Sequence, residues 1–201
     1  MHSRFAQTFS KVILGILAIY FLYLFSKAIN IINRRHISTD DGVYINSTTS
    51  SPYIQKLSTD LTKHCNNNLC RVQTVLDYIT NIPYKINDFQ AHSPQDTIQK
   101  NFGDCDDKSN LLISLLHELK IKSYFVLVPK HIFVVVALDE VHLNHFRKGL
   151  YINGKKFYIL ESTSKNSPIG FPLQYKLDEI KTIIEPFENR KIDISQLEWK
   201  L

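Results

Sequence analysis

Apolar residues form one unbroken run close to the N-terminus. Val12–Phe25 holds only apolar and tyrosine side chains, and the apolar pattern resumes after Lys27 as far as Ile32. A helix of about 20 residues crosses the hydrocarbon core of a bilayer, and a lysine near its end can extend its charge toward the headgroups. Val12–Ile32 is therefore predicted to form a transmembrane helix, and residues 1–33 are predicted to be a membrane anchor or a signal segment.

The same run can also be interpreted as a cleaved signal peptide. Arg4 and Lys11 form a basic start, and Ser26-Lys27-Ala28 offers small residues near a cleavage point. Basic residues flank both ends of the run, so charge alone does not set its orientation. Under both interpretations the following domain is exported, either as the extracytoplasmic part of a single-pass membrane protein or as a secreted protein.

The hydrophobic pattern behind this run predicts a linker and then helices. Residues 34–51 are polar and are predicted to be a linker to a domain at 52–201. Helices are predicted at about Pro52–Lys63 and Arg71–Ile82, the second with apolar positions at helical spacing. Ser93 as N-cap and Pro94 at the first helical position predict a short third helix, and Asn110–Leu119 predicts a fourth.

Extended segments follow the helices. Tyr124–Val128, His131–Leu138 and Lys156–Glu161 are rich in β-branched and aromatic residues, which is typical of strands. Asn153-Gly154 predicts a tight turn before the third of them. Helices first and an antiparallel sheet afterwards indicate the α+β fold class.

Charge and cysteine content narrow the class of protein. The formal net charge is +5, but the basic residues are scattered rather than gathered in a stripe, so no nucleic-acid partner is predicted. An odd number of cysteines in an exported protein suggests one pair and one free thiol. Cys65 and Cys70 are the natural pair, as a disulfide or as two idle thiols, and Cys105 remains. Zinc bound with His64 is disfavoured because no second ligand cluster has matching spacing.

Cys105 is predicted to lie in the first turn of a helix. Asp104 is a good N-cap residue, and Asp107 stands where a capping box needs an acid. The helix dipole and the unpaired amides there favour a thiolate and lower the thiol pKa, and the amides could hold an oxyanion. Asp106 and Asp107 oppose this effect, so a cationic partner is needed. A buried structural cysteine would show the same pattern.

His131 and Glu161 are predicted to be neighbours. His131 opens one predicted strand and Glu161 closes another. If these strands pair antiparallel, the two side chains meet at one sheet edge. A carboxylate beside an imidazole fixes its tautomer and raises its basicity, which completes a nucleophile, base and orienter with Cys105. Alternatively, His131 simply caps an edge, and Glu161 is a solvated strand end.

Three segments together resemble the transglutaminase-like superfamily: Gly103-Asp104-Cys105, the strand start His131-Ile132-Phe133, and Leu160-Glu161-Ser162-Thr163. The upstream His92-Ser93-Pro94 resembles the segment before the cysteine motif in bacterial and archaeal members. The resemblance implies a papain-like fold and thiol chemistry on amide bonds without a cofactor. It implies Cys105 as nucleophile, His131 as base and then acid, and Glu161 as orienter. Glu161 replaces the commoner Asp, and no proline follows it.

The leading hypothesis is a membrane-tethered thiol enzyme that hydrolyses or transfers an amide of a protein or peptide substrate through a thioester on Cys105. The alternative is a catalytically silent domain that binds a peptide or protein partner in the same cleft. A weaker hypothesis is a redox or metal sensor built on Cys65 and Cys70. No metal or other cofactor is predicted.

Overall fold

The computed structural model describes residues 3–32, 35–39, 42–86, 91–140, 143, 145 and 147–201 of the chain. These residues form two compact units, Met1–Arg35 and His36–Leu201. The first unit consists almost entirely of one helix, and the second holds the remaining helices and the strands. The two units are described separately below.

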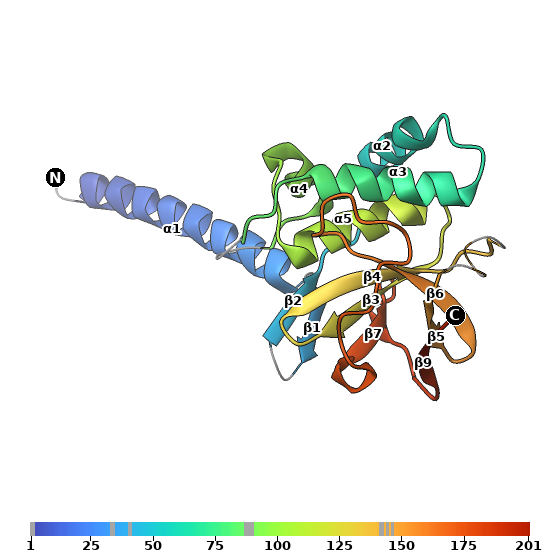
Figure 1. Cartoon of the computed structure of the whole chain (residues 1–201). Helices are drawn as coiled ribbons and strands as arrows, with labels where there is room; N and C mark the ends of the chain where they lie inside the picture. The colour runs from blue at the N-terminus through green and yellow to red at the C-terminus, as the bar shows by residue number, and fades with distance from the viewer. Residues whose placement is uncertain are drawn as a thin grey trace. The chain divides into compact units, whose positions relative to one another are not determined.

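The N-terminal unit is the long helix α1, Ser3–Ile32 (Figure 1). Within it, Thr8–Ser26 is a stretch of 19 residues with a mean hydropathy of 1.9, none of it buried. Large side chains such as Leu14 and Phe21 are exposed. The predicted apolar helix is therefore confirmed, and by length and composition it can either cross a membrane or serve as a signal sequence.

The polar stretch 34–51 differs from its prediction as a linker. Two strands, β1 (Arg35–Thr39) and β2 (Gly42–Asn46), pair as a small sheet; residues 34, 40 and 41 lie outside the described part of the chain. Asn46 is only 3% exposed, and its Nδ2 donates to the Pro186 carbonyl at 2.6 Å. Composition did not identify this segment because its apolar residues are few among polar ones; Ile37 packs in the core, and polar side chains such as Asn46 add hydrogen bonds to the domain. Asn46 is the first residue of an Asn-Ser-Thr sequence. Its side-chain amide is buried and hydrogen-bonded inside the domain.

Four helices of the domain begin at side-chain caps. They are α2 (Pro52–Thr62), α3 (Asn68–Asn81), α4 (Pro94–Lys100) and α5 (Cys105–Glu118). Ser93 and Asp96 form a full capping box at α4, as the predicted N-cap requires. The helix α5 is buried continuously from Asp107 to Leu116 and is the central helix of the domain.

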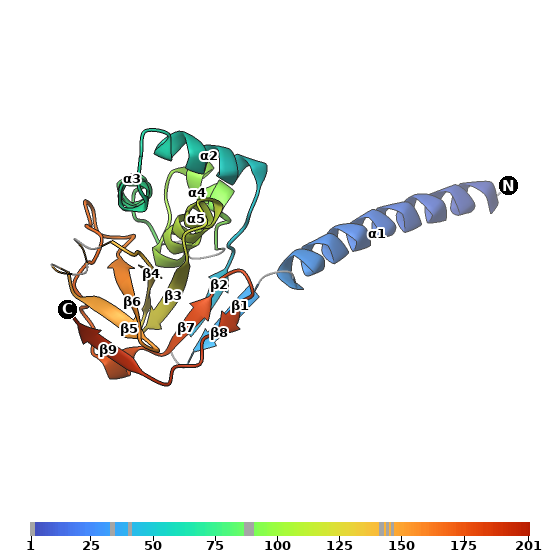
Figure 2. The same cartoon turned by 90° about the vertical axis from the view of Figure 1, so that its right-hand side faces the viewer.

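The domain sheet has the strand order β8-β7-β3-β4-β6-β5-β9 among the described residues, with antiparallel pairing of its neighbours (Figures 1 and 2). The strands are β3 (Ser123–Val128), β4 (His131–Val136), β5 (Gly149–Ile152), β6 (Lys155–Leu160), β7 (Thr182–Glu185), β8 (Arg190–Lys191) and β9 (Leu197–Lys200). A short 3-10 helix, η1, covers Leu177–Glu179.

The three predicted strands are confirmed as β3, β4 and β6. Asn153 and Gly154 both have positive φ in the turn that joins β5 to β6, as the predicted tight turn requires. The helices precede an antiparallel sheet, so the α+β class is confirmed. The strands at the two margins of the sheet were not predicted because they are only two to four residues long, too short for an alternating pattern.

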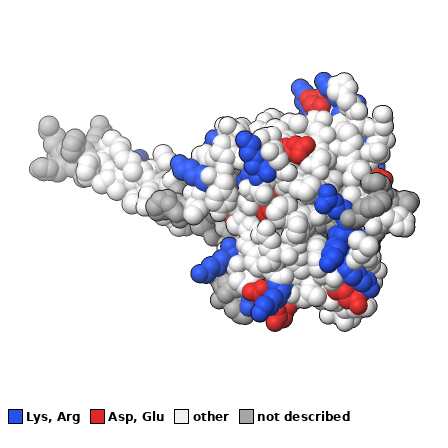
Figure 3. Space-filling model, in the orientation of Figure 1, with Lys and Arg blue, Asp and Glu red and all other residues white. Residues whose placement is uncertain are grey.

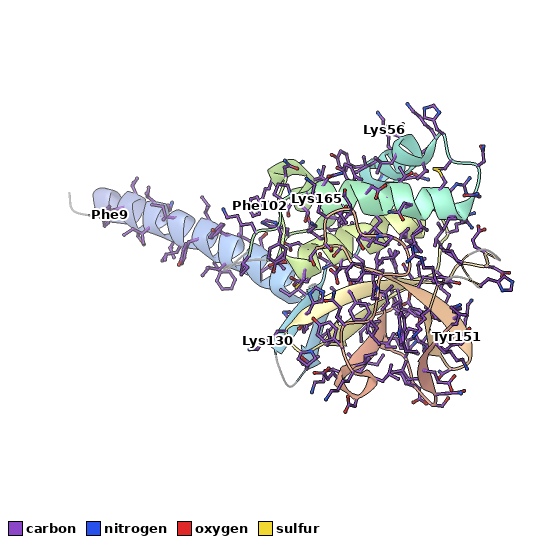
Figure 4. All side chains as sticks on the ribbon, viewed as in Figure 1. Phe9, Lys56, Phe102, Lys130, Tyr151 and Lys165 are labelled. Atoms are coloured by element: carbon purple, nitrogen blue, oxygen red, sulfur yellow. A yellow bond between two sulfur atoms is a disulfide. The ribbon has the colours of Figure 1, made fainter. Side chains whose placement is uncertain are left out.

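The two faces of the sheet are buried against different partners. Ile132, Val134 and Val136 point to the face that α5 covers, and α2 and α3 pack outside α5 (Figure 2). Phe133 and Val135 point to the other face, where they join a second apolar cluster. Because strand residues alternate in direction, His131 lies on the Phe133 face, at the very start of β4. Lys130, in the turn before it, marks this end of the sheet (Figure 4).

The basic side chains are dispersed over the visible face of the domain rather than gathered over one element (Figure 3). Some of them have partners close in sequence, such as Arg190, whose Nε lies 2.9 Å from Glu188. This surface is mixed in charge where it can be seen. This mixed surface differs from the group of side chains gathered around His131.

Candidate active site

His131 and Glu161 form a direct contact at the end of the sheet. The last paired residues of the two strands are Val134 and Leu160, so Glu161 follows immediately after the ladder. The Nε2 atom of His131 lies 2.9 Å from Oε2 of Glu161, and both side chains keep limited solvent access, 17% and 12%. The structure therefore brings these two predicted site residues together as the antiparallel pairing suggested.

The Glu161 carboxylate is held on both oxygens. While Oε2 contacts His131, Oε1 accepts from the backbone N–H of Thr163 at 3.0 Å and from its hydroxyl at 2.6 Å. Burial raises the pKa of Glu161, but the hydrogen bonds from His131 and Thr163 outweigh it and leave the pKa below its ordinary value. Glu161 is thus an oriented anion. Since it occupies Nε2 of His131, Nδ1 is the ring nitrogen left to exchange a proton.

Cys105 lies beside the start of β4. It is the first residue of α5, and Asp104 caps that helix by accepting from the Asp107 N–H, as predicted. The helix α5 packs on β4, and Cys105 packs against the apolar cluster to which Ile132 belongs. The backbone N–H of Ile132, the residue after His131, lowers the pKa of the Cys105 thiol. This N–H is available because the pairing of β4 with β6 begins only at Val134.

Tyr175 connects the three predicted residues. Its ring stacks on the His131 ring with centroids 6.2 Å apart. Burial raises the pKa of Tyr175, and the charges of Glu161 and Cys105 raise it further, so both groups lie within electrostatic range of one phenol. His131 and Glu161 are therefore in direct contact, and Tyr175, which stacks on His131, also responds to the charge of Cys105.

The Cys105 thiol does not have the low pKa that its helix position predicted. Burial, together with the charges of Asp106 and Asp104, raises the pKa of Cys105 to about 12. The N–H groups of Ile132 and Asp106 lower it only in part. The prediction was wrong because burial and two adjacent carboxylates outweigh the helix dipole. The thiol is protonated at neutral pH, so a base must remove its proton before it can attack.

The acidic cluster at the start of α5 is a structural network. Burial raises the pKa of Asp106 to about 8, and a hydrogen bond with Asp104 adds to this effect. Asp107 accepts from the His92 backbone N–H at 2.6 Å, and its second oxygen lies 3.2 Å from Nδ1 of the same residue. Oxygens of the three carboxyls lie within 4.8 Å of one another. Hydrogen bonds to the Asp107 and His92 N–H groups hold this cluster, whereas Asp107 Oδ2 and His92 Nδ1 are buried without a hydrogen-bond partner among the described residues.

Lys108 supplies a buried cation that the sequence analysis did not identify. It is 1% exposed, and its Nζ donates to the Ile82 carbonyl at the end of α3 at 2.8 Å. Burial lowers the pKa of Lys108 to about 8, while the Glu161 charge raises it. Lys108 stands three residues after Cys105 on α5, but the charge that acts on it is that of Glu161. The three-residue spacing from Cys105 was the available sequence signal for this position. A lysine in such a polar segment is, however, normally expected to be exposed to solvent.

Tyr84 lies on the solvent side of the thiol. It pairs with Gly103, and the Lys85 N–H donates to the Gly103 carbonyl at 3.1 Å. Gly103 is required there because a Cβ at this position would lie 2.8 Å from the Asp107 Cβ. Tyr84 is 52% exposed, and burial together with the Cys105 charge raises its pKa. An exposed aromatic ring therefore borders the site from the loop before α4.

The remaining cysteines pair as predicted. Cys65, in the connection between α2 and α3, and Cys70, in the first turn of α3, form a disulfide, which leaves Cys105 as the free cysteine of the described residues. This bond removes the zinc alternative with His64, because disulfide sulfurs are not thiolate ligands. The disulfide lies outside the neighbourhood of His131.

Comparison with known proteins identifies a matching protein family. The model of the transglutaminase-like superfamily matches residues 55–159, more than half of the chain. That range includes Cys105 and His131 and ends two residues before Glu161. No curated protein matches the chain.

Two solved structures are similar at low identity. A candidate cysteine protease from Cytophaga hutchinsonii is 20% identical with a TM-score of 0.43, over 76% of this chain and 53% of that one. A candidate protease from Parabacteroides distasonis is 14% identical with a TM-score of 0.46, over 72% of this chain and 28% of that one. This chain thus spans about half the length of the first and a smaller part of the second.

Proposed function

Because this chain belongs to the transglutaminase-like superfamily, we propose that its domain is a cysteine-nucleophile enzyme that attacks amide bonds of protein or peptide substrates. The observation that carries the proposal is the His131–Glu161 contact at 2.9 Å, close to Ile132, whose backbone N–H lowers the pKa of the Cys105 thiol. A nucleophile, a base and an orienting acid within one neighbourhood is the arrangement that acyl transfer requires.

In the proposed reaction His131 first acts as the base. Its Nδ1 takes the thiol proton, and the Glu161 carboxylate on Nε2 stabilises the resulting imidazolium. The Cys105 sulfur attacks the amide carbon, and the C–N bond breaks as the imidazolium returns the proton to the leaving amine. The acyl group remains on Cys105 as a thioester, which water or an amine then resolves.

The raised thiol pKa determines how this step proceeds. A pKa of about 12 leaves very little thiolate at neutral pH, so nucleophilic attack depends on proton transfer to His131 rather than on a preformed ion pair. The amides in the first turn of α5 are available donors for the oxyanion that develops on the substrate. Activity is therefore expected to require His131 throughout the neutral pH range.

We also propose that α1 tethers the domain to a membrane on its extracytoplasmic side. The apolar stretch Thr8–Ser26 is long enough to span a bilayer, and the Cys65–Cys70 disulfide is typical of an oxidising compartment. Cleavage of α1 as a signal peptide would give a secreted enzyme instead. N-terminal sequencing of the chain purified from its host distinguishes the two outcomes.

A second candidate function is a catalytically silent domain that binds a peptide. The high pKa of Cys105 favours it, since an inactive relative has no need of a reactive thiol. Alkylation by iodoacetamide at pH 7.5 separates the two candidates, with Cys105→Ser as the control for labelling elsewhere. The enzyme requires that His131→Ala slow the labelling of Cys105 at least about tenfold. Equal rates in the wild type and His131→Ala would support the silent domain.

A further inference from the structure

A cavity opens next to His131 and Glu161, on the sheet face away from α5. Its volume is about 290 Å³, close to the lower end of the range for ligand pockets and suited to a single large side chain. Its apolar surfaces come from Phe133, Ile159, Phe171, Pro172 and Leu173. The mechanism proposed above does not use this cavity.

The chain builds the cavity with a loop that is fixed at both ends. After β6 the N–H groups of Gly170 and Phe171 both donate to the Ile159 carbonyl, at 3.0 and 3.2 Å. Gly170 has a φ of +76°, which permits the turn that sends the loop over the sheet. Past η1, the Lys181 N–H donates to the Leu127 carbonyl at 2.8 Å. The loop between these anchors forms the outer wall.

Tyr175 joins the cavity to the reacting thiol. Its ring stacks on His131 and on Phe133, with centroids 6.2 and 6.4 Å away, and it also lines the cavity. The charge of Cys105 reaches the same phenol. A substrate residue next to an amide held at Cys105 could therefore place its side chain between Phe133 and the loop.

The charges of the lining residues exclude an acidic side chain. Glu161 is an anion at the rim, and no Lys or Arg is among the described residues that line the cavity. A basic side chain would have to leave water for a cavity with largely apolar walls, and the Glu161 oxygens already contact His131 and Thr163. Thr163, Ser164 and Gln174 leave the rim polar but uncharged.

We propose that this cavity is a specificity subsite that receives an uncharged apolar or aromatic side chain of the substrate, beside the amide attacked. The proposal rests on the proposed enzymatic function and adds a substrate class to it. Phe133 and Ile159 are almost fully buried and give the subsite an apolar floor. A leucine or phenylalanine side chain that enters the cavity takes its own apolar surface out of water, which favours binding.

N-chloroacetyl amino-acid amides test the subsite, since they alkylate a thiol with loss of chloride and carry a chosen side chain. Rates of Cys105 alkylation are measured on the full chain with Phe, Leu, Gly, Asp and Lys compounds. Phe and Leu are expected to react at least about tenfold faster than Gly, and Asp more slowly than Gly. Rates within twofold of one another for all five compounds, or a preference for Asp, would overturn the subsite.

Two leucines of the same loop region provide matched variants. Leu173 lines the cavity, whereas Leu177 packs against the same apolar cluster without lining it. Leu173→Ser is expected to reduce the ratio of the Phe rate to the Gly rate at least about threefold, while Leu177→Ser keeps that ratio. Equal ratios in the two variants contradict the assignment. The wild-type panel tests the proposal even if either variant folds poorly.

His131→Ala separates this inference from the proposed function. One outcome is that His131→Ala slows the alkylation of Cys105 by iodoacetamide and by all chloroacetyl compounds, while the compounds with different side chains react at equal rates with the wild type. In that case the subsite alone is wrong. If His131→Ala leaves every rate unchanged, the proposed function fails and the subsite, as part of it, fails as well. Slower rates in His131→Ala together with the Phe and Leu preference support both.

Discussion

His131 and Glu161 meet through Nε2 and Oε2 at 2.9 Å, beyond the point where β4 and β6 stop pairing. Because the ladder ends at Val134 and Leu160, the edge of β4 near His131 remains open to other groups. Glu161 and the Cys105 thiol both approach this edge, the first from the end of β6 and the second from α5. The end of one strand pairing thus determines where the candidate chemistry takes place.

The raised pKa of Cys105 predicts a specific pH dependence of its alkylation. In His131→Ala the thiol must ionise without a base, so the iodoacetamide rate should rise about tenfold per pH unit from pH 7 to pH 10. It should not level off in that range, because burial raises the pKa to about 12. A pH series of the labelling rate checks this. A plateau below pH 9 would show that the thiol pKa is not raised.

Asp106 is predicted to make the fold less stable at higher pH. Its pKa is raised to about 8, chiefly by burial, so between pH 4 and pH 8 the folded chain keeps a proton that the unfolded chain has released. Stability contributed by this group is present below its ordinary pKa and is lost as the pH rises through that window. Asp106→Asn cannot ionise and should unfold at a higher urea concentration than the wild type at pH 8.

The comparison at two pH values provides the control for this prediction. At pH 8 the gain in the free energy of unfolding is expected to be on the order of 1 kcal/mol, and at pH 5 it should be smaller. Asp60→Asn, at an exposed position of α2, should show no such difference. The prediction is wrong if Asp106→Asn is less stable than the wild type at pH 8.

Lys108→Met is predicted to preserve the fold and impair the site. A buried charge replaced by an apolar group of similar length is often tolerated or stabilising. The Lys108 ammonium interacts with Glu161, and without it the Glu161 carboxylate should take up a proton at higher pH. The acid limb of the Cys105 labelling profile should then move to higher pH.

The matched control for Lys108 is Lys120→Met, which changes an exposed lysine at the far end of α5. Lys120→Met should leave the labelling profile where it is in the wild type. A Lys108→Met chain that folds normally and has an unchanged acid limb would remove Lys108 from the account of the site.

The Cys65–Cys70 disulfide is predicted to support stability rather than reactivity. The two cysteines are five residues apart in the sequence, so the bond closes a short loop at the start of α3. Replacing both cysteines with serine should cost about 2 kcal/mol of unfolding free energy and leave the labelling rate of Cys105 within twofold. Urea unfolding and iodoacetamide kinetics on the same preparation check both parts. A large loss of Cys105 reactivity would instead favour the redox-sensor hypothesis.

Local sequence signals predicted the parts of the site that lie at element boundaries. Asp104 as N-cap placed Cys105 at a helix start, and the hydrophobic strands placed His131 and Glu161 at the ends of neighbouring strands. These features depend on capping chemistry and on antiparallel pairing, both of which can be derived from short segments. The disulfide followed from the count and spacing of the cysteines.

Features that depend on tertiary burial could not be derived in this way. The pKa of Cys105 is raised by desolvation and by carboxylates whose burial is decided by the whole fold. Lys108 is buried against the end of α3, far away in the chain, and Asn46 is fixed by a carbonyl 140 residues later. In each case a polar residue has an interior position that hydrophobic periodicity assigns to solvent.

The most direct test of the account is a double-mutant cycle on Glu161 and His131, with the rate of Cys105 alkylation by iodoacetamide at pH 7.5 as the measured quantity. Glu161→Gln should slow the wild type at least about tenfold. In the His131→Ala background it should change the rate less than twofold, because Glu161 acts on the thiol only through the imidazole. An equal loss in both backgrounds would contradict a base oriented by Glu161.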